Sequence, residues 1–182
     1  MGQANGLTNG ASERGKRTGQ ANGTSVSNFW KSAKRWTKGT SNRTFVMWPL
    51  VLFALHSFMH SDVQRVNAWA LPVLILGYAQ YRLVGIYRGR HGGGGPGMSV
   101  PPERLVSSGP YSWVRNPMYL GHILFFFGLA LMFNGVAWVV FAGHAIWFDQ
   151  RARADERQLI DLFGQPYRDY MHRVKRWVPG IY

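Results

Sequence analysis

Apolar residues along this chain gather into three long blocks separated by short polar segments. The blocks are Phe45–His60, Ala68–Tyr87 and Tyr119–Phe148, and the last holds 30 residues without a formal charge. A helix needs roughly 20 apolar residues to span a bilayer, so the third block fits either one long span or two short ones. This clustering predicts an all-α, integral-membrane protein rather than a soluble bundle.

The charges between the blocks favour four crossings. Lys and Arg prevail before the first block, in the loop 88–118 and after the third block, and the positive-inside rule places all three stretches in the cytosol. An even number of crossings must separate them, so the third block must cross and return. Asn134-Gly135, near its middle, is a good turn dipeptide. We predict about four transmembrane helices, of which Tyr119–Phe133 and Val136–Phe148 form a C-terminal helical hairpin.

Beyond the third block the pattern changes from apolar to amphipathic. The segment carries two pairs of opposite charge at i,i+4 spacing, which support a helix surface: Asp149 with Arg153, and Arg151 with Asp155. We expect the fourth crossing to continue into the cytosol as a helix that stops at Gly164. A short cytosolic helix, Tyr167–Val174, is expected to follow.

The first 44 residues differ from the rest in composition. Gly, Asn, Ser and Thr dominate them, and eight Lys or Arg stand against one acidic residue, Glu13. Such a segment cannot bury enough apolar surface to offset the entropy of ordering, so we expect a disordered basic tail, 1–44, before a membrane domain, 45–182. The tail is either a solvated arm or a contact to anionic lipid. Nucleic-acid binding is not expected, because no recognition module accompanies the net charge of +13.

Candidate chemistry lies where the third block begins. Arg115 and Asn116 precede Pro117, which suits the first turn of a helix, and helix N-termini attract anions. Arg115 adds a planar cation suited to a carboxylate. On the other arm of the hairpin, Asp155 and Glu156 could hold an ammonium group or ribose hydroxyls. This set suits S-adenosylmethionine, whose sulfonium favours aromatic faces, but a snorkelling arginine and solvated acids would give the same pattern.

Short motifs follow one another in a fixed order between Ala68 and Pro179. They are Gly109-Pro110-Tyr111, Arg115-Asn116-Pro117-x-Tyr119-x-Gly121, Asp155-Glu156, Phe163-Gly164, Tyr167 and Tyr170. In combination they resemble the isoprenylcysteine carboxyl methyltransferase and phospholipid methyltransferase superfamily of integral-membrane enzymes, which use S-adenosylmethionine. The resemblance implies a cofactor pocket between the hairpin and the C-terminal helices, formed by Tyr111, Arg115, Asn116, Pro117, Tyr119, Gly121, Asp155 and Glu156.

Two positions depart from the family pattern. Asn116 stands where the family usually has His, and asparagine can donate a hydrogen bond but does not titrate near neutral pH. Asp155 replaces the usual first Glu and has a shorter reach. The resemblance implies an enzyme, whereas the Asn116 substitution favours a non-catalytic membrane scaffold that keeps the fold.

The resemblance implies methyl transfer to a lipophilic or small acceptor at the cytosolic membrane face. A carboxyl or thiol acceptor of the isoprenylcysteine type ranks above a phospholipid amine. A protonated amine must first lose a proton, and His122 is either a candidate base for that step or a helix-packing histidine. No metal is needed. We expect membrane lipid as a partner, both termini in the cytosol and a bacterial cytoplasmic membrane as the location.

Overall fold

The computed structural model describes residues 40–59, 66–93 and 101–180. The chain divides into two units, Met1–Thr44 and Phe45–Tyr182, and the second holds nearly all of the described residues. Apart from its last few residues, the predicted disordered tail lies outside the described residues.

Helices account for all regular structure in these described ranges. They are α2 (Thr40–Met59), η2 (Ala68–Ala70), α3 (Leu71–Gly92), η3 (Gly109–Ser112), α4 (Pro117–Phe133), α5 (Val136–Phe163) and α6 (Gln165–Arg173). The described residues also include an isolated parallel β-bridge between Val114 and Lys175. The predicted all-α class is confirmed.

The predicted hairpin is present as α4 and α5. The chain turns at Asn134 and Gly135, which have φ angles of 54° and 48°, a region that asparagine and glycine tolerate best. Helix α5 continues without a break to Phe163 and ends before Gly164, whose φ of 62° is typical of a residue that follows a helix. The predicted stop at Gly164 is therefore confirmed.

Several helix boundaries differ from the prediction. Helix α2 begins at Thr40, before the predicted first block and inside the predicted disordered stretch 1–44. Helix α6 begins at Gln165 rather than Tyr167, because Pro166 fits the first turn of a helix, where its missing N–H has no role. Helix α3 continues past Tyr87 to Gly92, although the added stretch includes the poor helix former Gly89.

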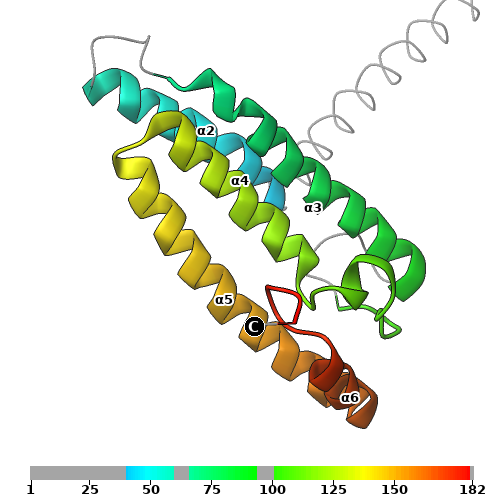
Figure 1. Ribbon diagram of the computed structural model, residues 1–182. Coiled ribbons are helices and arrows are strands. Elements are labelled where there is room, and N and C mark those ends of the chain that lie inside the picture. The colour runs from blue at the N-terminus through cyan, green and yellow to red at the C-terminus, as the bar shows by residue number, and fades with distance from the viewer. Residues whose placement is uncertain (1–39, 60–65, 94–100, 181–182) are drawn as a thin grey trace, which may run out of the picture. The chain divides into compact units, whose positions relative to one another are not determined.

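Helix α4 lies at the centre of the bundle, with α3 on one side and α5 on the other (Figure 1). Phe126, His122 and Ala130 of α4 are fully buried. Helix α2 packs on this core through a stripe at helical spacing: the rings of Phe45 and Trp48 contact Phe125 and Phe126, respectively, and Leu52 is buried in the same cluster. The core is thus largely aromatic.

Helices α3 and α4 approach each other closely at two glycines. A Cβ atom on Gly121 would lie 2.8 Å from the backbone nitrogen of Tyr81, and one on Gly77 would lie 2.5 Å from that of Phe125. Real side chains do not tolerate such contacts. Small residues that let backbones meet are typical of helix interfaces in membranes.

One helix of the described residues, Ala68–Gly92, is long and apolar enough to cross a membrane. The helices over Thr44–Met59 and Pro117–Phe133 are apolar but shorter. The structure therefore supports one of the four predicted crossings by length and composition. The other three crossings stay predictions. The apolar helices over Thr44–Met59 and Pro117–Phe133 are shorter than the roughly 20 residues that a perpendicular span requires, and α5 has 28 residues but is charged beyond Phe148.

Candidate functional site

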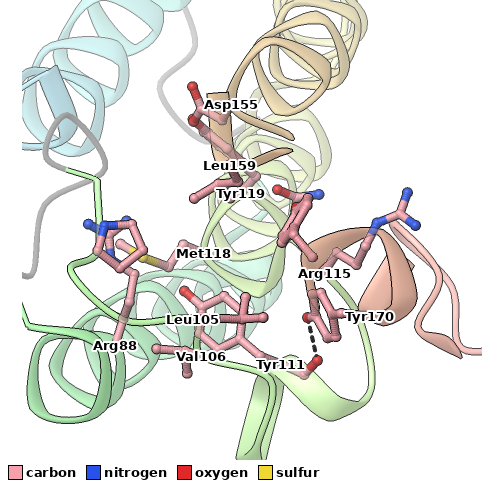
Figure 2. A pocket seen from close by; sticks show the side chains of 13 residues that line it. Arg88, Leu105, Val106, Tyr111, Arg115, Met118, Tyr119, Asp155, Leu159 and Tyr170 are labelled. Atoms are coloured by element: carbon pink, nitrogen blue, oxygen red, sulfur yellow. Dashed lines mark hydrogen bonds between the residues drawn. The ribbon is translucent and has the colours of Figure 1, made fainter. Parts of the chain in front are cut away.

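A cavity of about 80 Å³ lies where α4 begins (Figure 2). It is bounded by the end of α3, the segment 102–111, the first turn of α4, the C-terminal half of α5 and helix α6. Its lining residues are Arg88, Pro102, Leu105, Val106, Tyr111, Arg115, Asn116, Met118, Tyr119, Asp155, Leu159, Tyr167 and Tyr170. The lining thus combines one carboxylate residue, two arginines, one asparagine and four tyrosines with apolar side chains.

The tyrosines of the cavity are held in place by packing and by one backbone contact. The Tyr170 hydroxyl donates a hydrogen bond to the Tyr111 carbonyl oxygen at 2.6 Å, which ties α6 to η3 (Figure 2). Burial raises the pKa of Tyr111, Tyr167 and Tyr170 above the usual value of 10.0. All three phenols therefore remain neutral donors at physiological pH.

Asp155 lines the cavity and contacts two side chains. The Tyr119 hydroxyl donates a hydrogen bond to Asp155 Oδ2. Arg151 Nε lies 3.2 Å from Asp155 Oδ1, which confirms the predicted i,i+4 pair; the second predicted pair joins Arg153 Nε to Asp149 Oδ2 at 2.7 Å. The Asp155 side chain keeps 23% of its surface exposed, so a bound molecule can reach it.

Glu156 follows Asp155 in sequence but points into the protein interior. Its Oε1 accepts hydrogen bonds from Arg115 Nε at 3.0 Å and from Asn116 Nδ2 at 3.0 Å. Arg176 Nη2 donates to Oε2 at 2.7 Å and Arg176 Nε to Oε1 at 3.1 Å. Only 4% of the Glu156 side chain is exposed, so these partners replace the water that a buried carboxylate would otherwise need. We call Glu156, Arg115, Asn116 and Arg176 the buried ion cluster.

Arg115 uses its whole guanidinium group within the protein. Besides Glu156, it contacts the carbonyl oxygens of Met171 and Val174, to which Nη1 donates at 2.9 and 3.1 Å. In Figure 2 its guanidinium is turned away from Tyr111 and Arg88. The side chain therefore fastens the start of α4 to the end of α6, and its stem forms part of the cavity wall.

The structure brings five of the predicted cofactor residues to this cavity and leaves three outside its lining. Tyr111, Arg115, Asn116, Tyr119 and Asp155 line it. Of the other three, Glu156 lies in the buried ion cluster, Gly121 faces α3, and Pro117 lines an apolar groove on another side of the same segment.

His122, the weak candidate for a catalytic base, does not line the cavity. It has no exposed surface and lies among aromatic rings, 4.6 Å from the Phe45 centroid and 4.5 Å from that of Tyr81. Its Nδ1 lies 3.2 Å from the Met118 carbonyl oxygen. This environment corresponds to the alternative of a helix-packing histidine.

Two cations of the site were not singled out from the sequence. Arg176 is one of four Lys or Arg that follow Gly164, and nothing in its spacing marks it as the partner of Glu156. Arg88 was counted only among the basic residues of the loop after the second block, yet it lines the cavity from the end of α3. Both arginines can be assigned to the site only from the tertiary structure, which brings segments that are distant in the sequence together.

An apolar groove of about 720 Å³ runs along the other side of the segment 109–120. Leu76, Leu83 and Val84 of α3 form one wall, and Trp113, Pro117 and Trp177 contribute to the other. The side chains of one short segment thus divide between a polar cavity and an apolar groove. Trp113 is 72% exposed, which is unusual for so large a ring unless something apolar covers it.

Residues 94–166 match the model of a family described as phospholipid methyltransferase. The protein-S-isoprenylcysteine O-methyltransferases of Mus musculus and Saccharomyces cerevisiae are similar, with 39% and 36% identity over 80 residues each. The methanethiol S-methyltransferase 1 of Bradyrhizobium diazoefficiens is 37% identical over 84 residues. These matches cover 42%, 42% and 46% of this chain and 28%, 33% and 29% of the respective relatives. The matched part therefore spans a third or less of each relative.

Proposed function

We propose that this chain, which belongs to the isoprenylcysteine carboxyl methyltransferase and phospholipid methyltransferase superfamily, is a membrane-bound methyltransferase. It transfers a methyl group from S-adenosylmethionine to a lipophilic or small acceptor at the cytosolic face. One observation carries the proposal. Five side chains expected to form a cofactor pocket, from Tyr111 to Asp155, line one cavity, and all of them lie within the matched residues 94–166.

The donor set of the cavity suits S-adenosylmethionine, which supplies a methyl group on a positively charged sulfur when bound. Asp155 can accept hydrogen bonds from an ammonium group or from ribose hydroxyls. Arg88 lines the cavity, and a guanidinium group suits a carboxylate. The phenol rings offer faces to a sulfonium. The residues of the chain thereby align two molecules and exclude water, which are the main tasks in this kind of transfer.

The contact of Asn116 supports an enzyme rather than a scaffold. Its amide donates to Glu156 Oε1, so asparagine fills a hydrogen-bonding role at the position where the family usually has His. That role needs no titratable group. A scaffold that had lost the cofactor would have no reason to keep a carboxylate and phenols around the cavity.

Exposed apolar side chains support the membrane location. Phe58 of α2 is 89% exposed, Leu83 of α3 is 66% exposed and Val139 of α5 is 72% exposed. Soluble proteins rarely expose apolar surface on this scale on several elements, whereas lipid tails would cover it. The four crossings, the cytosolic termini and the bacterial cytoplasmic membrane remain part of this proposal.

The acceptor is best sought among carboxylates and thiolates with an apolar part. Such groups need no general base, whereas a phospholipid amine does, and His122 lies in the core rather than at the cavity. The groove along 109–120 gives an apolar chain a place beside the cavity. Among the similar proteins, the names isoprenylcysteine O-methyltransferase and methanethiol S-methyltransferase cover both a lipophilic and a small acceptor.

Calorimetric titration of the detergent-purified protein with S-adenosylmethionine and S-adenosylhomocysteine tests cofactor binding. We expect saturable binding that weakens about tenfold or more in Asp155→Asn, because a hydrogen bond to a charged group contributes about 1.5–3 kcal/mol. The exposed Asp161→Asn on the same helix is the matched control and should bind like the wild type. Well-folded wild-type protein that binds neither compound, while a family member binds in the same detergent, would leave a scaffold as the better description.

Transfer of a labelled methyl group then identifies the acceptor class. The probes are N-acetyl-S-farnesylcysteine, methanethiol and vesicles that contain phosphatidylethanolamine. We expect product from one of the first two and none from the third. Product from phosphatidylethanolamine alone would assign the chain to phospholipid N-methylation.

A further inference from the structure

We infer that the segment Val174–Pro179, called the C-terminal strap, serves both halves of the proposed site through two neighbouring residues. Arg176 is a positioning residue for the cofactor cavity, and Trp177 is a wall of the acceptor groove. This inference rests on the proposed function. It adds Arg176 and Trp177, which are not part of the motifs and lie beyond the family match, since that match ends at residue 166.

The backbone of the strap is held in register against the segment before α4. Val114 and Lys175 form a parallel bridge, and the Arg115 amide donates to the Lys175 carbonyl oxygen at 2.9 Å. Arg115 Nη1 also donates to the Val174 carbonyl oxygen. These contacts fix the backbone of the strap at Val174 and Lys175, so the side chains that follow have defined directions.

Arg176 reaches the cavity indirectly, through Glu156. It donates to both carboxylate oxygens, with the shortest distance, 2.7 Å, at Oε2. This fork orients the carboxylate so that Oε1 faces Arg115 and Asn116, both of which line the cavity. Without the fork, Glu156 can rotate, and the two wall residues lose the anchor that sets their orientation.

Trp177 turns the other way. Its ring lines the apolar groove together with Pro179, and its indole nitrogen donates to Asp149 Oδ1 at 2.9 Å, which keeps the ring in one orientation. An amphipathic ring fixed by one hydrogen bond is well suited to contact an apolar chain. The two residues share one partner, Asp149, whose Oδ1 also lies 3.7 Å from Arg176 Nη1. Their other contacts belong to different sites, so their effects on ligand binding should be separable.

The test measures two affinities for each variant by calorimetry in detergent. S-adenosylhomocysteine reports on the cavity and N-acetyl-S-farnesylcysteine on the groove. For Arg176→Gln we expect about tenfold weaker S-adenosylhomocysteine binding and farnesylcysteine binding within about twofold of wild type. Arg176→Lys keeps the charge without the fork and should fall between the two. The exposed Arg157→Gln, beside Glu156 on the same helix, is the matched control.

For Trp177→Leu we expect the opposite result: about tenfold weaker farnesylcysteine binding and little change for S-adenosylhomocysteine. Trp177→Phe keeps a ring and should recover part of the loss. Trp138→Leu, at the far end of α5, controls for the loss of an indole. If the strap had only a structural role, each variant would weaken the binding of both ligands.

The outcomes separate this inference from the proposal it rests on. Opposite selectivity of Arg176→Gln and Trp177→Leu supports the inference. The inference is overturned if each variant loses affinity for both ligands equally, or if neither variant loses affinity for either ligand. In both cases, binding by the wild-type protein leaves the methyltransferase proposal intact. Wild-type protein that binds S-adenosylhomocysteine but no farnesylcysteine overturns the Trp177 half. Wild-type protein that fails to bind S-adenosylhomocysteine removes the proposed function and the Arg176 half together.

Discussion

The first turn of α4 and its middle are held by different forces. At the start, Asn116 and Tyr119 donate hydrogen bonds to the acidic residues of α5, next to the guanidinium of Arg115. Further along, Gly121 meets the backbone of α3 and Phe126 is buried among other rings. The motif from Arg115 to Gly121 therefore contains two kinds of position: some form hydrogen bonds and ion pairs, and others let two helices pack closely.

This difference teaches that proximity in a motif does not imply a shared role. Gly121 stands two residues after Tyr119, yet it faces the neighbouring helix rather than the cavity. Substitutions in the first turn should alter ligand binding through charge, whereas those in the middle should alter stability through packing. Four predictions test that division.

Glu156→Ala should have the largest effect. The substitution leaves Arg115 and Arg176 buried beside each other without their common carboxylate, and breaking a buried ion pair in this way costs about 3–5 kcal/mol. Denaturant titration in detergent, followed by circular dichroism, measures the loss in free energy of unfolding. Asp161→Ala, an exposed acid on the same helix, is the control. Similar stability of the two variants would contradict a buried ion cluster.

Gly121→Val should destabilise the middle of α4 by about 1–3 kcal/mol, because the new Cβ would collide with backbone atoms of α3. The same chain offers a matched control in Gly143 of α5, whose Cβ position has nothing within 4 Å. Gly143→Ala should be neutral or slightly stabilising, since alanine is the better helix former. If both variants lose equal stability, the close approach of α3 and α4 is wrong.

His122→Phe should change little, because the ring sits among aromatic neighbours and the swap roughly conserves volume. We expect a stability change below about 1.5 kcal/mol. Initial rates of methyl transfer should stay within about threefold of wild type, since a general base contributes 10²–10⁴-fold and His122 is not expected to serve as one. A hundredfold drop in rate with an unchanged melting curve would make His122 a catalytic residue after all.

Asp149 should give the smallest effect, and one that depends on pH. Burial raises the pKa of Asp149, but the hydrogen bonds donated by Trp177 and Arg153 outweigh it, so the pKa lies below the usual 3.8. A lowered folded-state pKa stabilises the fold above about pH 4, and this contribution is lost as the pH falls through the folded value. The stability difference between wild type and Asp149→Asn should be below about 1 kcal/mol at neutral pH and should shrink towards pH 3. A difference that grows on acidification would contradict a lowered pKa.

Local signals predicted most of the helices, whereas the contacts of the site required the tertiary structure. The Asn134-Gly135 turn and the stop at Gly164 follow from residues that favour positive φ, so nearby sequence suffices. The resemblance to known enzymes implied which short segments gather at the cavity. Neither source distinguished Asp155 from Glu156, because adjacent residues on a helix face directions about 100° apart and only their surroundings decide which is buried. Arg176 joins from a segment that no motif marks.

The hydrogen-bond partners of Arg115 lie far along the chain, so its contacts form late during biosynthesis. The carbonyl oxygen of Val174 that accepts its hydrogen bond lies 59 residues further along the chain. At a synthesis rate of about 5–20 residues per second, Arg115 is made roughly 3–12 s before Val174. During this interval the guanidinium must be hydrated or bound to other groups. The α4–α5 hairpin can therefore form early, but its charged end becomes complete only in a late, long-range step of folding.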